Sequence, residues 1–276
     1  MPLEYACIMP HGRDIIPQLA ARKTKHLFAK TRESVRKIAR DIREVRPDTI
    51  VIASPHNLRL QDKIGIVTSE NTTGQLNGPR GKKVNLSLKC DREFAQDLLQ
   101  ESTRKHLPVV GANYGTAEGP ASDMPMDWGT LVPMWFVVKE ERVKARTVIV
   151  TPSREIPLKE NVALGTTIAK MAEKRKKRVV FIASADQAHA HKKFGPYGYH
   201  RSAAKYDELV SQAIRKNRIE SISRLNKRFI ESAKPDSLWQ MAMLAGLTRV
   251  VKMRGSLLSY EVPTYYGMVC ASFHRD

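Results

Sequence analysis

The chain alternates short apolar segments with longer amphipathic ones, and this alternation limits the folds that it can adopt. Short apolar runs rich in β-branched residues are typical of buried strands, and apolar residues spaced three or four apart are typical of helices. Strands that alternate with helices indicate an α/β fold. We therefore expect a central, mostly parallel or mixed sheet that is flanked by helices.

The predicted elements follow one another without an internal repeat. The predicted strands cover residues 5–9, 49–53, 63–68, 107–110, 146–150 and 179–183, and a strand-like stretch over 257–273 is interrupted at Pro263. The predicted helices cover residues 26–46, 91–104, 161–174, 203–216, 219–232 and 237–250. Residues 69–83 indicate a long loop or hairpin, and residues 111–129 an irregular segment. No segment has the composition of a linker, so we expect one domain over residues 1–276.

Charge and cysteine content exclude several classes of protein. The three cysteines are widely spaced, which argues against a disulfide framework or a cysteine zinc site and favours a cytoplasmic protein. No apolar run is long enough for a transmembrane helix, and the N-terminus does not resemble a secretory signal. The net charge is +19, but the densest basic cluster, residues 173–178, follows a predicted helix, where the dipole favours cations. No base-reading motif accompanies the charge, so we expect no specific nucleic-acid partner and no membrane partner.

Three histidines follow the ends of predicted strands. His11, His56 and His189 each follow the end of an apolar run, and these runs are far apart in the sequence. Ligands of open α/β sheets bind in the crevice at the carboxyl ends of the strands, so these imidazoles are expected at one rim. Two neutral imidazoles and one carboxylate form the facial arrangement that is typical of non-haem Fe(II) oxygenases. The pattern therefore predicts a metal site at the carboxyl ends of the strands.

The residues alone do not show which acid supplies the carboxylate of this site. Asp236 precedes a predicted helix, where aspartate is a common N-cap. Glu261 lies in an otherwise apolar strand, where an unpaired charge would be costly. Asp14 and Asp186 are closer to the histidines in the sequence, but neighbouring loop residues often point apart. The spacing of these acids in the sequence does not identify which of them is the third ligand.

Several motifs in this order resemble those of one enzyme superfamily. The chain is similar over nearly its whole length to the type III extradiol ring-cleavage dioxygenases, which include the protocatechuate 4,5-dioxygenase catalytic subunit and the Memo-like proteins. The segments that carry the resemblance are Met9-Pro10-His11-Gly12, Ser54-Pro55-His56, Asp127-Trp128-Gly129-Thr130-Leu131-Val132-Pro133, Ala183-Ser184-Ala185-Asp186-Gln187-Ala188-His189, Gly195-Pro196-Tyr197-Gly198-Tyr199 and Ser259-Tyr260-Glu261 with Ala271-Ser272-Phe273.

The resemblance implies a role for each candidate residue. In such enzymes the first two histidines bind Fe(II), which corresponds to His11 and His56. The third ligand lies at the start of the helix before the final strands, which favours Asp236 over Glu261. The later histidine is the acid–base residue, which corresponds to His189. The implied reaction opens the ring of a catechol-type aromatic and incorporates both atoms of O₂.

The substrate pocket departs from the family pattern at one position. Many members carry Asp-His-Gly where this chain has Trp128 between Asp127 and Gly129, so a histidine that positions substrate or oxygen is absent. We expect Trp128 to contact the substrate, and Tyr197 and Tyr199 either to wall the pocket or to pack their loop onto the body. The alternative function is a Memo-like metal-binding or interaction protein without ring cleavage. Because family members are often oligomeric, we expect a homo-oligomer.

Overall fold

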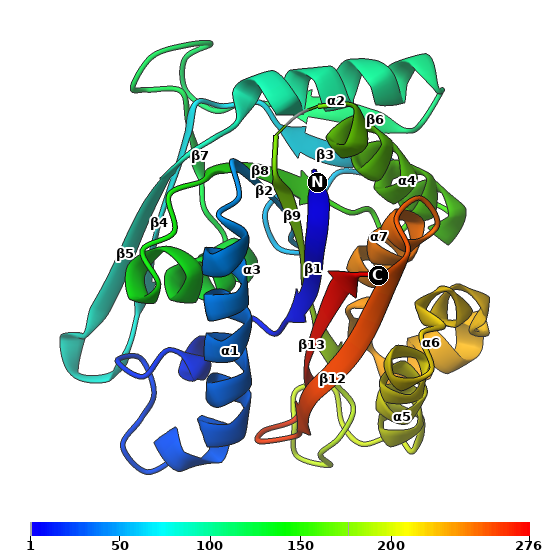
Figure 1. Ribbon diagram of the computed structural model, residues 1–276. Coiled ribbons are helices and arrows are strands. Elements are labelled where there is room, and N and C mark those ends of the chain that lie inside the picture. The colour runs from blue at the N-terminus through cyan, green and yellow to red at the C-terminus, as the bar shows by residue number, and fades with distance from the viewer. Residues whose placement is uncertain (1, 176) are drawn as a thin grey trace.

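The computed structural model describes residues 2–175 and 177–276 and has an α/β architecture (Figure 1). Lys176 of the basic cluster at 173–178 lies outside the described residues. The central sheet consists of β1 (Leu3–Met9), β2 (Thr49–Ala53), β3 (Ile64–Val67), β6 (Val109–Ala112), β8 (Arg146–Thr151), β9 (Val179–Ser184), β10 (Asp186–Ala188), β11 (Pro235–Asp236), β12 (Met253–Glu261) and β13 (Met268–Arg275).

The central sheet is mixed. Its strand order is β11-β10-β13-β1-β9-β2-β8-β3-β6, and β12 pairs with β13. The strands β1, β9, β2 and β8 run parallel, whereas β13 is antiparallel to β1 and β3 is antiparallel to β8. A smaller sheet contains β4 (Asn71–Asn77), β5 (Lys83–Lys89) and β7 (Asp123–Pro125). The expected mixed sheet is therefore confirmed, and its parallel centre carries the long apolar runs of the sequence.

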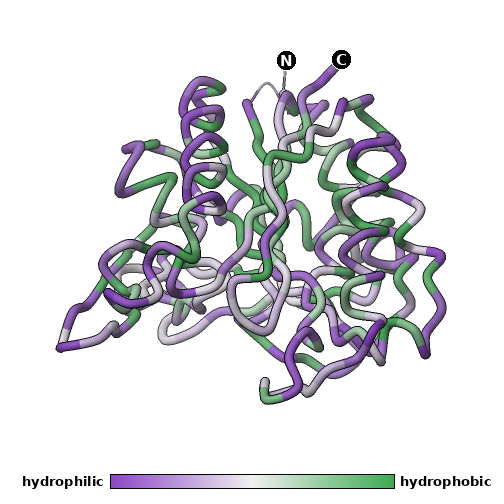
Figure 2. Tube along the Cα trace, turned by 90° about the horizontal axis from the view of Figure 1, so that it is seen from below, coloured by the Kyte–Doolittle hydropathy of each residue, from purple (hydrophilic) through white to green (hydrophobic). Residues whose placement is uncertain are grey.

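Helices cover both faces of the sheet. They are α1 (Ala29–Val45), α2 (Arg92–Arg104), α3 (Trp128–Met134), α4 (Leu158–Lys174), α5 (Ser202–Arg215), α6 (Lys227–Ala233) and α7 (Leu238–Thr248). Within β1, Ala6 and Ile8 pack against one face with α2, α4, α5 and α7, whereas Tyr5, Cys7 and Met9 pack against the other face with α1 and α3. This division follows from the alternation of side chains along a strand. Figure 2 shows apolar segments through the middle of the molecule and polar segments at its periphery.

Two segments, residues 219–232 and 111–129, differ from the sequence-based expectation, and two others agree with it. Residues 219–232 form two short helices, η5 (Ile219–Arg224) and α6, because the Asn226 side chain accepts a hydrogen bond from the Arg228 N–H and starts a new helix. The expected loop or hairpin at 69–83 is a hairpin of β4 and β5. The irregular prediction for 111–129 missed β7 and the start of α3, which continues as the π-helix η4 (Trp135–Glu140). The strand-like C-terminal stretch is the hairpin of β12 and β13.

Two glycines allow α4 and α7 to cross closely. A Cβ atom on Gly165 would overlap the backbone carbonyl of Met243, and one on Gly246 would overlap that of Val162. Because neither carbonyl can move without shifting its helix, Gly165→Ala is expected to lower the free energy of unfolding by roughly 1–3 kcal/mol. The melting temperature measures this effect. Lys170→Ala, on the exposed side of α4, is the matched control and should leave the melting temperature almost unchanged.

Candidate metal centre

The ends of two parallel strands bring two histidines together. His11 follows β1, and His56 follows β2, and both strands flank β9 in parallel. Their carboxyl ends therefore meet at one edge of the sheet. Asp236 reaches the same edge from β11, which pairs with β10 in a register that places Asp236 opposite Asp186. Ser237, not Asp236, occupies the N-cap position of α7, so the Asp236 carboxylate is not used as a helix cap.

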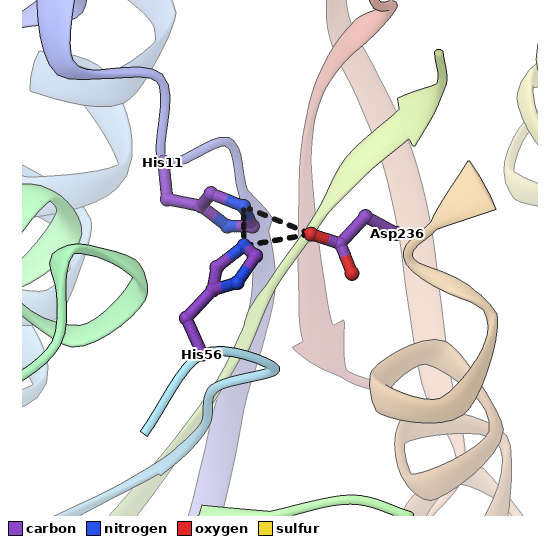
Figure 3. Close-up of side chains that lie close together, drawn as sticks. All are labelled: His11, His56 and Asp236. Carbon is purple, nitrogen blue, oxygen red and sulfur yellow. Dashed lines mark hydrogen bonds and ion pairs between the residues drawn. The ribbon is translucent and has the colours of Figure 1, made fainter. Parts of the chain in front are cut away.

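The three side chains converge on one point (Figure 3). The Nε2 atoms of His11 and His56 lie 3.1 Å apart. The Oδ2 atom of Asp236 lies 2.7 Å from the Nε2 atom of His56 and 3.5 Å from that of His11. His11 and Asp236 are buried, and His56 is partly exposed. Among the described residues, this is the one group of three or more His, Cys, Asp or Glu side chains with donor atoms close enough to share a metal ion.

The spacing of the donor atoms fits one ion with three neighbouring ligands. Nitrogen and carboxylate donors bind metal ions at about 2.1 Å, and two donors in adjacent octahedral positions then lie about 3.0 Å apart. The distances of 2.7, 3.1 and 3.5 Å lie around this value. The residues therefore fit a divalent metal ion held on one side, with further coordination positions left for other ligands.

A hydrogen-bond chain fixes the tautomer of His11. The Ser184 hydroxyl donates its single proton to the Gly129 carbonyl, so its oxygen accepts from the Nδ1–H of His11 at 3.0 Å. The Nε2 atom of His11 then carries a lone pair toward His56 and Asp236. Such outer partners orient imidazole ligands and keep them basic. Burial alone would lower the pKa of His11, but the nearby carboxylates of Asp186 and Asp236 raise it overall.

Two acids near His11 have different environments. Burial alone would raise the pKa of the Asp236 carboxyl, but its contacts with the imidazoles of His11 and His56 lower this pKa well below its ordinary value. Asp186 accepts a hydrogen bond from the His11 backbone N–H at 3.0 Å, and burial raises its pKa. Asp236 thus offers an ionised oxygen to a cation. Asp186 holds the backbone that carries His11 through Oδ1, and its Oδ2 atom lies 3.4 Å from the His11 Nε2 atom.

Arg154 is a site residue that the sequence reasoning missed. It follows β8, whose carboxyl end lies at the same edge of the sheet, and its guanidinium group binds the Oδ1 atom of Asp236. The guanidinium also lies over the Trp239 ring, 4.9 Å from its centroid. One carboxylate oxygen is therefore held by Arg154 while the other faces the histidines. Arg154 follows a buried parallel strand, and this is the same signal that identified the histidines in the sequence.

Removal of the Arg154 guanidinium is expected to weaken metal binding without unfolding the protein. In Arg154→Gln the Asp236 carboxylate can rotate away from the histidines, so metal affinity should fall roughly 10- to 100-fold, as it does when outer partners of ligands are lost. Titration with Fe(II) under anaerobic conditions measures the change. Arg59→Gln, an exposed arginine in the loop after β2, is the control. Unchanged affinity in Arg154→Gln would contradict this role.

The candidate acid–base residue lies beside the three converging side chains. The Nδ1–H of His189 donates to the Gln187 carbonyl at 2.8 Å, which leaves its Nε2 atom as a proton acceptor. Burial lowers the pKa of His189 below its ordinary value. Its ring stacks on Tyr266, with centroids 5.1 Å apart, and meets the edge of Tyr197 at 5.6 Å. His189 is therefore a neutral base in an aromatic environment.

These residues line a cavity of about 620 Å³. This volume suits a small organic ligand. Its wall includes His11, His56, Asp236 and His189 together with the aromatic residues Trp128, Tyr197, Tyr265 and Tyr266. The Trp128 ring stacks on His56, with centroids 4.0 Å apart. The sequence reasoning missed Tyr265 and Tyr266, although they lie in the segment between the two strand-like halves of the C-terminal stretch.

Two residues named from the sequence lie elsewhere. Tyr199 is exposed and does not line the cavity, because its backbone pairs with His191 and directs this part of the loop outward. The expectation that Tyr199 contacts the substrate therefore has no support in the structure. The Glu261 carboxylate accepts hydrogen bonds from the backbone N–H and the hydroxyl of Thr31, at 2.8 and 2.6 Å, so it is engaged at the start of α1. The acid that joins the histidines is Asp236.

Fold and site together define an α/β protein with two histidines and one aspartate at the carboxyl ends of its strands. The model of a family described as the catalytic LigB subunit of aromatic ring-opening dioxygenase matches residues 5–271, so the chain belongs to this family. The expected superfamily is confirmed. Among the described residues, no helix is both long and apolar enough to cross a membrane.

Individual relatives support the fold. The chain is 26% identical over 264 residues to a Clostridium acetobutylicum protein named Protein CA_C1420; the match covers 95% of this chain and 55% of that protein, so the chain spans about half of its length. The crystal structure of the uncharacterized protein JW3007 from Escherichia coli K12 matches with a TM-score of 0.62 and 14% identity. That match covers 98% of this chain and 99% of the other.

Proposed function

We propose that this chain, as one catalytic domain, is an Fe(II)-dependent extradiol dioxygenase that opens the ring of a catechol-type aromatic with both atoms of O₂. The observation that carries the proposal is the convergence of His11, His56 and Asp236 on one point in the wall of the cavity. Two imidazoles with one carboxylate are the ligand set of non-haem Fe(II) oxygenases. The family description, an aromatic ring-opening dioxygenase, supports the same reaction class.

The proposed ligands provide an open coordination face. When bound, iron supplies the redox chemistry that lets O₂ react with an aromatic substrate. His11 and His56 would hold the ion through Nε2, and Asp236 would hold it through one carboxylate oxygen, while Arg154 binds the other oxygen. Ser184 keeps the His11 lone pair directed inward. The three side chains that would bind the ion all line the cavity, so a substrate in the cavity would lie beside them.

The cavity wall provides proton transfer and orientation. His189 accepts the proton of a substrate hydroxyl at Nε2 and later returns it, which a neutral imidazole with a lowered pKa can do at neutral pH. The rings of Trp128, Tyr197 and Tyr266 line the same cavity and hold a flat aromatic substrate beside His189. Holding both reactants in a fixed orientation lowers the entropic part of the barrier.

Anaerobic loading with Fe(II) followed by a panel of catechols in air tests this proposal. The expected result is a yellow ring-opened product and consumption of one O₂ per substrate. Protein loaded with Zn²⁺, which has no redox chemistry, is the control and should be inactive. Stoichiometric iron without O₂ consumption for any catechol would contradict ring cleavage.

One observation favours a second candidate function, a metal-binding or interaction protein of Memo-like type. Trp128 stands where many family members carry histidine, and its ring stacks on His56. A tryptophan there supplies no second acid–base group. Iron binding without ring opening in the experiment above would favour this function. A homo-oligomer stays a prediction for either function.

A further inference from the structure

A group of basic side chains lies at the pole opposite the metal centre. The segments that lead into β2, β8 and β9 are adjacent there, because Thr49 is in register with both Arg146 and Val179. Asp48 joins them, since its N–H donates to the Arg178 carbonyl and its carbonyl accepts from Arg146. This group, which we call the basic pole, consists of Arg43, Arg46, Arg142, Lys144, Arg146 and Arg178.

The basic pole is separated from the metal centre by the length of the parallel strands. Its residues lie at the amino ends of β2, β8 and β9, whereas His11 and His56 follow the carboxyl ends of β1 and β2. A five-residue strand spans about 17 Å. In Figure 1, the chain leaves the upper end of α1 and enters β2 at a level above the point at which β1 ends. A ligand at this pole is therefore independent of the cavity and of the proposed dioxygenase function.

Three adjacent depressions form a basic trough on this pole. The central one has a volume of about 340 Å³ and shares Arg43 and Arg46 with a second of about 390 Å³. It shares Lys144 with a third of about 590 Å³, which Arg146 also lines. No aromatic residue lines any of the three. Eight basic residues line the trough against the three acids Glu44, Asp48 and Asp91, so it is net cationic, and it has no rings on which nucleotide bases could stack.

Most charges of the basic pole have no acidic partner. Arg43 binds Glu141 at 2.7 Å, and Arg178 lies 3.7 Å from Asp48. For the other four, no carboxylate lies within 4.0 Å in the part of the chain that the structure describes. Neighbouring like charges that are not neutralised raise the local positive potential and attract anions. The four are Arg46, Arg142, Lys144 and Arg146.

Two of these arginines occupy backbone positions that favour glycine. Arg46 ends α1 with a φ of 51°, and Arg142 follows η4 with a φ of 56°. A left-handed residue after a helix is usually glycine, and another residue there costs about 1 kcal/mol. The helix dipole attracts cations, but Arg43 already provides one in the last turn of α1. The side chains of Arg46 and Arg142 both line the central depression of the trough.

We propose that the basic pole binds the phosphate backbone of double-stranded nucleic acid without reading its sequence. Successive phosphates match an extended cationic trough better than a single anion does. The lack of aromatic residues in the trough argues against single strands, which proteins hold mainly by base stacking. The chain has no base-reading motif, which agrees with contacts to the backbone alone. The overall charge of +19 adds long-range attraction.

Binding of a labelled 20-base-pair duplex, as RNA and as DNA, tests the proposal by fluorescence anisotropy over a range of salt. The wild-type Kd is expected to be on the order of micromolar at about 50 mM salt and to rise steeply with salt. Arg46→Gly and Arg142→Gly should each weaken binding about fivefold and reduce the salt slope by about one. Their melting temperatures should stay the same or rise, since glycine suits the backbone.

Arg80→Gly is the matched control. Arg80 also has a left-handed backbone, with a φ of 56°, and lies in the turn between β4 and β5, outside the basic pole. Arg80→Gly removes one positive charge, as the pole variants do, but this charge lies outside the basic pole. The variant should therefore change the Kd by less than about twofold. Arg146→Gln removes a charge of the basic pole without a backbone change and should behave like Arg46→Gly. Equal losses in Arg80→Gly and the pole variants, or no binding by the wild type, would overturn the proposal. Iron content, which should be the same in all variants, separates this test from that of the metal centre.

Discussion

His56→Ala is expected to lose stoichiometric iron while the protein stays folded. His56 supplies one of three donors, and its Nε2 atom is closer to the Asp236 carboxylate than that of His11. Loss of a partner outside the ligand set costs roughly 10- to 100-fold in metal affinity, so loss of a ligand should cost more than about 100-fold. The side chain is partly exposed and leaves no cavity in the core, so the melting temperature of the metal-free protein should change little.

Metal analysis of protein reconstituted with one equivalent of Fe(II) and then desalted measures this loss. His26→Ala is the matched control, because His26 is exposed and lies outside the cavity wall. It should retain the iron content of the wild type. Full iron content in His56→Ala would show that the ion is held elsewhere.

His189→Ala is expected to separate metal binding from turnover. The variant should retain iron, because His189 is not among the three converging side chains. Its rate of ring opening should fall by roughly 10²- to 10⁴-fold, the usual contribution of a positioned acid–base group. Tyr199→Phe, on the same loop region but outside the cavity wall, is the control and should retain the wild-type rate.

The dependence of the rate on pH gives a second readout for His189. Burial disfavours the imidazolium form, which lowers the pKa of His189 below its ordinary value of 6.5. The imidazole of His189 therefore stays neutral as the pH falls to 6.5, and the wild-type rate should decrease only below this pH. The decrease of the rate at low pH that comes from protonation of His189 should be absent in His189→Ala. A variant that keeps the full rate, or that loses its iron, would contradict the assigned role.

The parallel central strands were predicted well because they are buried on both faces. The expected strand at 49–53 has the same bounds as β2, whose residues are all buried. Continuous apolar runs are typical of parallel strands with helices on both sides. The helix that begins at Trp128 was missed, because Gly129 and Pro133 are poor helix formers and the segment is fixed by its burial. Tertiary packing outweighs local propensity there.

The candidate site was only partly accessible to sequence reasoning. The position after parallel strands brought out His11 and His56, since it depends on topology alone. Asp236 could not be chosen without the family resemblance, because an aspartate before a helix is usually a cap. The contact between Arg154 and Asp236 joins the segment after β8 to β11, which is far away in the sequence, so local patterns do not reveal it. The exposed position of Tyr199 follows from the path of its loop, which residue types do not specify.

A crystal structure of the protein loaded anaerobically with Fe(II), with anomalous data collected at the iron edge, examines the proposed metal centre itself. We predict one anomalous peak at about 2.0–2.3 Å from the Nε2 atoms of His11 and His56 and from a carboxylate oxygen of Asp236. A fully loaded crystal in which the peak contacts neither histidine, or contacts only one of the three residues, would contradict the assignment.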